Sequence, residues 1–201
     1  MLFSDLFRSD SSTRDKFLSR LFGIFSEEIV RCWASAPEAP YEDLGRPTVK
    51  APTNESRGYT LDFTFRSKAD DAIYIVEMKS ELQYQNYKYL ILSEPSQLNH
   101  HMKKPAFHHF LEMAKSPKTY QVEVNGKPQE VDGSVLIWGS YNEIGRKDVR
   151  DRFGFADILS VENIVNDLNS WNNEGFSDLI NRYDNWSSEL FDGLLSEGSQ
   201  G

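Results

Sequence analysis

The sequence predicts an α/β (α+β) domain in which a central mixed sheet is flanked by helices. Apolar residues between Arg14 and Trp33 fall on one stripe at the period of a helix. Residues 59–65 alternate between apolar and polar side chains, as in a strand with one buried face, and residues 72–76 form an uninterrupted apolar run. A helix is thus followed by one strand with a single buried face and one strand buried on both faces. This order indicates a sheet packed against helical layers.

The first half of the chain gives the elements in a simple order. The helix over 14–33 ends before a Pro-rich segment, residues 36–52, which we expect to be a loop. The strand over 59–65 places Asp62 on its polar face, because successive strand side chains point to opposite faces. The apolar run at 72–76 is typical of a central strand that is covered on both faces.

The second half adds helices, strands and a hairpin to this start. Asn125-Gly126 follows an alternating segment, which is a strong signal for a β-hairpin. The expected helices are 80–92, segments on either side of Pro105, 161–171 and 176–195, and the expected strands are 120–124 and 135–138.

Length and charge indicate a single domain with an acidic end. A chain of 201 residues suits one domain, and we expect its core within about 14–140, followed by an acidic helical extension over 153–201. The net charge is −9; residues 153–201 contain nine acidic residues and one basic residue, Arg182, so this segment carries −8 and the rest only −1. Contact with phosphates is therefore compatible with the first three quarters of the chain.

Cysteine content and hydropathy indicate a cytoplasmic protein outside membranes. Cys32 is the only cysteine, so the chain forms no internal disulfide and no cysteine-based zinc site. Asp5, Arg8 and Asp10 interrupt the first residues, and no stretch approaches the ~18 apolar residues of a membrane span. We expect neither export nor insertion into a membrane.

Three charged residues on adjacent strands are the candidate catalytic set. Glu77 and Lys79 follow the apolar run and share one face of its strand, while Asp62 lies on the preceding strand. Two carboxylates can hold Mg²⁺, and an ammonium can balance the charge that develops on a reacting phosphate. The alternative is that Glu77 and Lys79 form an ion pair on a solvated strand face.

Asp62, followed by Glu77-x-Lys79 at the end of the next hydrophobic strand, resembles the PD-(D/E)xK phosphodiesterase superfamily of restriction enzymes, resolvases and repair exonucleases. The resemblance covers roughly Arg14 to Leu92, with Val135 to Trp138 as a later core strand, and departs from the motif at Leu61, which is not proline. It implies a restriction-endonuclease-like sheet, Mg²⁺ (or Mn²⁺) bound by Asp62 and Glu77, and Lys79 acting on the attacking water or the transition state. The function it implies is a metal-dependent nuclease, acting on DNA rather than RNA.

Members of this superfamily often add a glutamate from the first helix, where Glu27 and Glu28 are both available. With Phe17 as zero, the apolar stripe centres near about 90°, with Glu28 near about 20° and Glu27 near about 280°. Glu28 is therefore the expected third catalytic and metal-binding carboxylate, because it lies at the edge of the stripe.

Polar residues after Lys79 are candidate contacts for nucleic acid. Gln83-xxx-Tyr87 looks like the Q-xxx-Y element of RecB-type nucleases, and Lys88 follows it; ordinary helix surface is the alternative. All four histidines lie between His100 and His109, and a zinc site is disfavoured because His101 and His108 would lie two helical turns, about 10 Å, apart. With neighbouring lysines they form a basic stretch, whose candidate phosphate contacts are His100, His101, Lys103 and Lys104.

The acidic end favours a second hypothesis. Apolar residues from Phe176 to Phe191 repeat at helical spacing among acidic residues. We expect this segment to lie away from Asp62, with its stripe buried against the domain, a second copy or a protein partner. The alternative function is accordingly a protein-interaction module that keeps a nuclease-like fold without catalysis.

Overall fold

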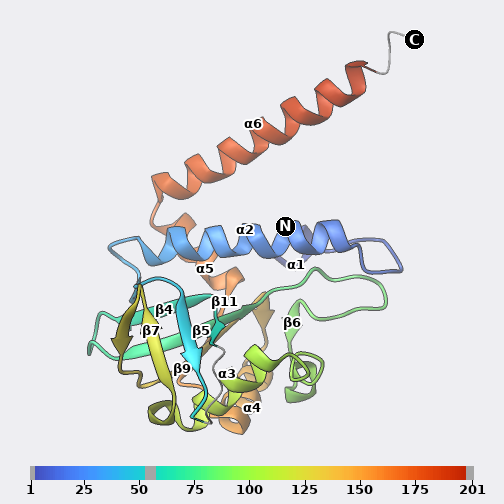
Figure 1. The fold of residues 1–201 in the computed structure, drawn as a ribbon. Helices are drawn as coiled ribbons and strands as arrows, with labels where there is room; N and C mark the ends of the chain where they lie inside the picture. Colours follow the sequence, from blue (N-terminus) through green and yellow to red (C-terminus); the bar gives the residue numbers. More distant parts are fainter. Residues whose placement is uncertain (1–2, 53–57, 198–201) are drawn as a thin grey trace.

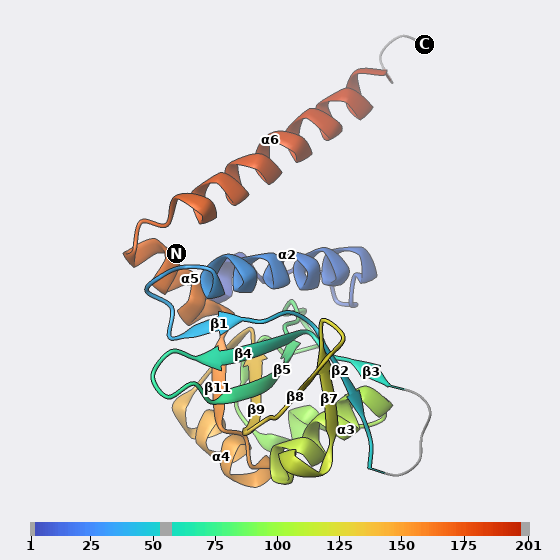
Figure 2. The same ribbon diagram turned by 60° about the vertical axis from the view of Figure 1, so that its left-hand side comes forward.

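A five-stranded mixed sheet forms the centre of the protein, as a computed structural model of residues 3–52 and 58–197 shows (Figures 1 and 2). Its strand order is β1-β4-β5-β9-β11. Strand β4 is antiparallel to both of its neighbours, β1 and β5, whereas β9 and β11 run parallel to β5. The strands are β1 (Tyr41–Asp43), β4 (Phe63–Ser67), β5 (Ile73–Lys79), β9 (Gly133–Trp138) and β11 (Asp157–Ser160).

Smaller sheets lie beside the central one. Four strands pair in the order β3-β2-β7-β8, and two more, β6 and β10, form a short parallel pair. Their bounds are β2 (Pro47–Lys50), β3 (Tyr59–Thr60), β6 (Ile91–Leu92), β7 (Gln121–Val124), β8 (Lys127–Gln129) and β10 (Ser140–Tyr141).

Helices cover both faces of the central sheet. They are α1 (Phe3–Leu6), α2 (Lys16–Ala34), α3 (Pro105–Lys115), α4 (Glu143–Phe153), α5 (Val161–Ser170) and α6 (Glu174–Glu197), with 3-10 turns η1 (Pro95–Leu98) and η2 (Pro117–Thr119). Helix α2 lies across one face, α3 and α4 lie on the other, and α6 extends away from the body beyond α2 (Figures 1 and 2).

The alternation of β9 explains this layering. Val135 and Ile137 belong to the apolar cluster formed with α2 and α5, whereas Leu136 and Trp138 belong to the cluster formed with α3, α4 and the second sheet. All four side chains are fully buried. A strand buried on both faces reads as a continuous apolar run because it has no solvent face, and the sequence shows that pattern here.

The structure confirms the mixed α/β class and most of the strongly patterned elements. The helix expected over 14–33 is α2, which begins where the Asp15 carboxylate accepts hydrogen bonds from the backbone N–H groups of Phe17 and Leu18. The hairpin expected at Asn125-Gly126 joins β7 to β8, and both residues have positive φ, as a type I′ turn requires.

Three expectations were wrong in detail. The segment 36–52 is not only a loop, since it contains β1 and β2. Residues 59–65 are not one strand, because β3 and β4 belong to different sheets and the break falls at Leu61 and Asp62. Residues 80–92 do not form a helix, since the Gln83 backbone pairs with Phe7 and Ser9 of the N-terminal segment and so gives up helical hydrogen bonding.

The segment 153–201 is not only a helical extension either. Its residues 157–160 form β11, an edge strand of the central sheet, and Ile158 is fully buried. Edge strands of four residues carry little periodicity, so the pattern of the following helix hides them. The sheet therefore continues past residue 140, where we expected the core to end.

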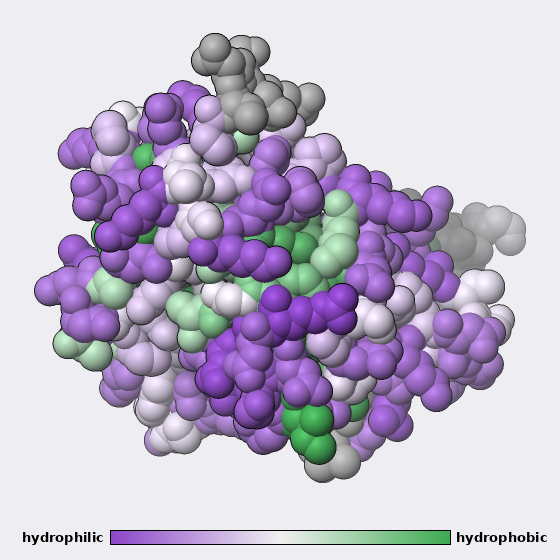
Figure 3. All heavy atoms as spheres, turned by 90° about the horizontal axis from the view of Figure 1, so that it is seen from below, coloured by the Kyte–Doolittle hydropathy of each residue, from purple (hydrophilic) through white to green (hydrophobic). Residues whose placement is uncertain are grey.

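The apolar stripe of α6 is buried only at its beginning. Phe176 and Leu179 pack against the domain, whereas Trp186 is 59% exposed. The large exposed apolar side chains lie mostly on α1, α2 and α6, and the face opposite α6 is mainly hydrophilic with a small apolar area near its centre (Figure 3). The domain therefore covers only the beginning of the stripe, and its burial against a second copy or a protein partner stays a prediction.

Within residues 3–52 and 58–197, no helix combines the length and the apolar character that a membrane span needs.

The place of β11 in the core gives a stability prediction. Ile158→Ala should lower the free energy of unfolding by about 2–5 kcal/mol, because it leaves a cavity in a packed core. Ile144→Ala, at a side chain that is 75% exposed, should change it by less than about 0.5 kcal/mol. Urea unfolding of both variants measures the difference, and equal small effects would show that β11 is peripheral.

Candidate active site

The structure brings Asp62, Glu77 and Lys79 together at the end of β5. The β4–β5 register pairs Phe63 with Val76, and its continuation by one residue sets Asp62 opposite Glu77. The Met78 backbone N–H donates a hydrogen bond of 2.8 Å to Asp62 Oδ2. Lys79 Nζ donates to the Glu77 carboxylate and, at 2.9 Å, to the Met78 carbonyl oxygen.

Strand geometry explains this convergence. Ile75, Glu77 and Lys79 lie on one face of β5, since side chains repeat every two residues. Ile75 fills the core, and the two charged residues come where the strand ends. Asp62 lies where the chain leaves the second sheet and enters the central one, so its position depends on the join between the two sheets.

Burial makes Glu77 the most perturbed acid of this cluster. The side chain is 7% exposed, and the loss of hydration raises its pKa to about 7; the Lys79 ammonium opposes this rise and the Asp62 carboxylate adds to it. Lys79 Nζ also lies 5.4 Å from the centre of the Phe107 ring, whose face favours a cation. Carboxylates with raised pKa values in such clusters are common at functional sites.

The first helix presents Glu27 to this cluster, and not Glu28 as we expected. The pKa of Glu27 is raised by burial and then by the Asp62 charge, and its carboxylate lies 3.9 Å from Arg31 Nη2. Glu28 lines a shallow pocket against α6 together with Arg182.

The expected orientation of α2 was wrong because its apolar residues lie on two different surfaces, one exposed and one buried against the sheet. Phe17, Leu21 and Ile24 are exposed, while the buried face of α2 centres on Ser26, Val30 and Trp33. Measured from that face, Glu28 is about 165° away and Glu27 about 95°.

Arg46 is a site residue that the sequence did not indicate. Its guanidinium Nη2 lies 3.7 Å from Asp62 Oδ1, and its side chain is about half exposed. Arg46 comes from the segment just before β2, which we expected to be an unstructured loop. An exposed guanidinium beside a carboxylate cluster can bind a phosphate, for which its planar donors are well suited.

Gln83, Tyr87 and Lys88 lie on an irregular segment beyond the site. Lys88 is exposed, and Gln83 is held by the N-terminal segment through its backbone. Tyr87 is half-buried next to Glu81 and Arg14, and burial and then the Glu81 charge raise its pKa. Their expected helix is absent, so a shared helical face does not direct them to a phosphate.

The basic stretch separates into exposed lysines and buried histidines. Lys103 and Lys104 are exposed. His101 is only 1% exposed, and burial lowers its pKa to about 2; His100 is half-buried, and burial lowers its pKa as well. The expectation that His101 contacts phosphate is wrong, because the side chain is buried and uncharged at neutral pH.

The donor set at the end of β5 fits a hard divalent cation. Asp62 and Glu77 offer carboxylate oxygens side by side, and Glu27 adds negative charge from α2. Oxygen ligands of this kind are those that Mg²⁺ and Mn²⁺ prefer. Lys79 and Arg46 supply positive charge next to them for an anionic ligand.

Compared with models of known protein families, with curated proteins and with solved structures, the chain shows no significant match.

The raised pKa of Glu77 predicts a specific pH dependence of stability in chelator-treated protein. Its folded-state pKa of about 7 exceeds the ordinary glutamate pKa of 4.5, so its contribution to stability is present below about pH 4.5 and is lost as pH rises through 7. Glu77→Gln removes this titration. From pH 5 to 8, the free energy of unfolding of the wild type should therefore fall relative to that of the variant by on the order of 2 kcal/mol.

Urea unfolding across this pH range measures that difference. Glu130→Gln removes an exposed carboxylate and serves as the control. A difference between wild type and Glu77→Gln that stays constant from pH 5 to 8 would contradict the burial argument.

Proposed function

We propose that the chain is a Mg²⁺-dependent nuclease that hydrolyses phosphodiester bonds, with DNA rather than RNA as its substrate. The observation that carries the proposal is the buried Glu77 carboxylate, opposite Asp62 and paired with Lys79 at the end of a central strand. The resemblance of Asp62 and Glu77-x-Lys79 to PD-(D/E)xK enzymes supports it. A mixed sheet with helices on both faces agrees with the restriction-endonuclease-like architecture that the resemblance implies.

Each residue of the site has a role in the proposed reaction. Asp62 and Glu77 would hold the cation, and Glu27 would add charge from α2. Mg²⁺, when bound, polarises a phosphoryl oxygen and lowers the pKa of a coordinated water. Lys79 balances charge that develops on the phosphate, and Arg46 binds a neighbouring phosphate of the backbone.

The acidic end is compatible with this proposal. Helix α6 lies beyond α2 and extends from the body (Figure 1). The beginning of α6 packs near Glu28 and Arg31, whereas acidic residues on its extended part are largely screened where they lie more than a Debye length of ~8 Å from the site.

Cleavage assays test the proposal. Purified protein should cleave linear, circular or single-stranded DNA with Mg²⁺ or Mn²⁺, and EDTA should abolish cleavage. Lys79→Ala should lower the rate by about 10²–10³-fold, the usual cost of removing one group that stabilises transition-state charge, and Asp62→Asn by at least as much. RNA in parallel reactions tests the substrate preference.

Glu27 and Glu28 provide a matched pair within the same assay. Glu27→Gln should lower the rate by about tenfold, as for partners that surround a metal site, whereas Glu28→Gln should change it by less than about twofold. Equal activity of wild type, Asp62→Asn and Lys79→Ala would contradict the proposal.

The surface of α6 favours one second candidate function, a non-catalytic interaction module. Leu21, Ile24 and Phe25 of α2 face Tyr183 and Trp186 of α6 across an apolar groove. The residues of α6 carry six acidic groups and Arg182, a charge of −5. The groove and charge together fit a basic amphipathic helix of a partner protein. A folded chain that binds such a peptide and cleaves no nucleic acid would support this function.

A further inference from the structure

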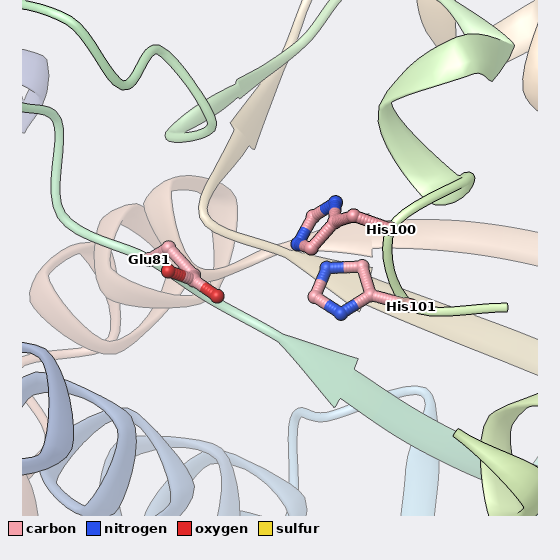
Figure 4. A group of neighbouring side chains, drawn as sticks. All are labelled: Glu81, His100 and His101. Atoms are coloured by element: carbon pink, nitrogen blue, oxygen red, sulfur yellow. The ribbon is translucent and has the colours of Figure 1, made fainter. Parts of the chain in front are cut away.

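Three metal-ligand side chains converge beyond the end of β5, outside the Asp62 cluster. Glu81 follows β5 by two residues, whereas His100 and His101 come from the turn between η1 and α3. One ligand atom from each residue lies within 4.8 Å of the others, and the side chains point toward one another (Figure 4). The spacing argument against zinc compared His101 with His108, whereas Glu81 lies nineteen residues before His100, so no local pattern indicates this group.

His101 is the member of this group whose polar side-chain atoms both lack hydrogen-bond partners in the described part of the chain. The side chain is 1% exposed, and neither ring nitrogen has a hydrogen-bond partner among the described residues. Leaving a buried polar group unsatisfied costs about 1–3 kcal/mol. Burial lowers its pKa, so the ring is neutral and one nitrogen carries a free lone pair, as a metal ligand requires.

His100 is oriented as metal-binding histidines usually are. Its Nδ1 lies 3.0 Å from the Gln97 carbonyl oxygen, so the Nδ1–H donates there and Nε2 keeps its lone pair. A second ring nitrogen that donates to a backbone carbonyl fixes the tautomer and the orientation of a ligating imidazole. Nε2 has only a long contact, 3.4 Å, with the Tyr87 hydroxyl.

Glu81 supplies the negative charge of the group. Its side chain is mostly buried, and Arg14 Nη2 lies 2.8 Å from Oε2 in an ion pair whose geometry does not make a hydrogen bond. Arg14 is about half exposed, so it can move as a cation approaches. The carboxylate has two oxygens and can keep one toward Arg14 while the other faces the imidazoles.

We infer that Glu81, His100 and His101 form a second metal site, which binds one divalent transition-metal ion of the Zn²⁺ class. Two imidazoles and one carboxylate suit Zn²⁺ and leave a fourth position for water, whereas Mg²⁺ prefers oxygen ligands. Ligands of a tetrahedral site with bonds of about 2.0–2.1 Å are about 3.3 Å apart, so the ligand atoms need to approach one another by at most about 1.5 Å on binding. This site does not rest on the proposed nuclease function.

Zinc titration of the chelator-treated full chain tests this inference. Competition with a chromogenic chelator should give one Zn²⁺ per chain, and Mg²⁺ in excess should not displace it. Glu81→Gln, His100→Gln and His101→Gln should each weaken binding by more than tenfold. His108→Gln, at an exposed histidine, and Asp62→Asn, in the other cluster, should leave the affinity unchanged within about twofold.

X-ray absorption of the zinc-loaded wild type gives a test that does not depend on the folding of any variant. Two imidazole nitrogens and oxygen ligands at about 2.0–2.1 Å should account for the spectrum. A stoichiometry of zero, a spectrum without imidazole scattering, or loss of binding in His108→Gln or Asp62→Asn but not in His100→Gln would overturn the inference.

Discussion

The structure depends on one cross-strand contact, in which Met78 donates its backbone N–H to the Asp62 carboxylate. Asp62 lies in the two-residue break between β3, which ends at Thr60, and β4, which begins at Phe63. It therefore lies where the chain passes from the second sheet to the central one. The same contact keeps Asp62 opposite Glu77, so the join between the sheets and the candidate site have a common origin.

This arrangement carries an electrostatic cost that a cation would relieve. Two neighbouring carboxylates lose hydration at a buried strand end. The Lys79 ammonium compensates for this loss at Glu77 only in part, because the pKa of Glu77 remains raised. Buried ion pairs contribute little net stability, since desolvation offsets their attraction. Perturbed carboxylates cluster at functional sites, and this is the basis of the proposed cation site.

Sequence patterns predicted the parts of the fold that local geometry controls. Strand alternation was sufficient to pair Glu77 with Lys79, and the hairpin followed from Asn125-Gly126. Contacts between distant segments were not predictable in the same way: residues 80–92 resemble a helix, yet the Gln83 backbone pairs with the N-terminal segment. Glu28 was preferred to Glu27 because the apolar residues of α2 face two different surfaces, and no local pattern separates them.

Crystals of the full chain soaked with Mn²⁺ would test the central claim most directly, because anomalous scattering locates this ion without reference to activity. The account predicts an anomalous peak between the carboxylates of Asp62 and Glu77, at oxygen-ligand distances of roughly 2.0–2.3 Å. It also predicts that the peak disappears in Asp62→Asn. A well-ordered site without such a peak at saturating Mn²⁺, with Lys79 still paired to Glu77, would contradict it.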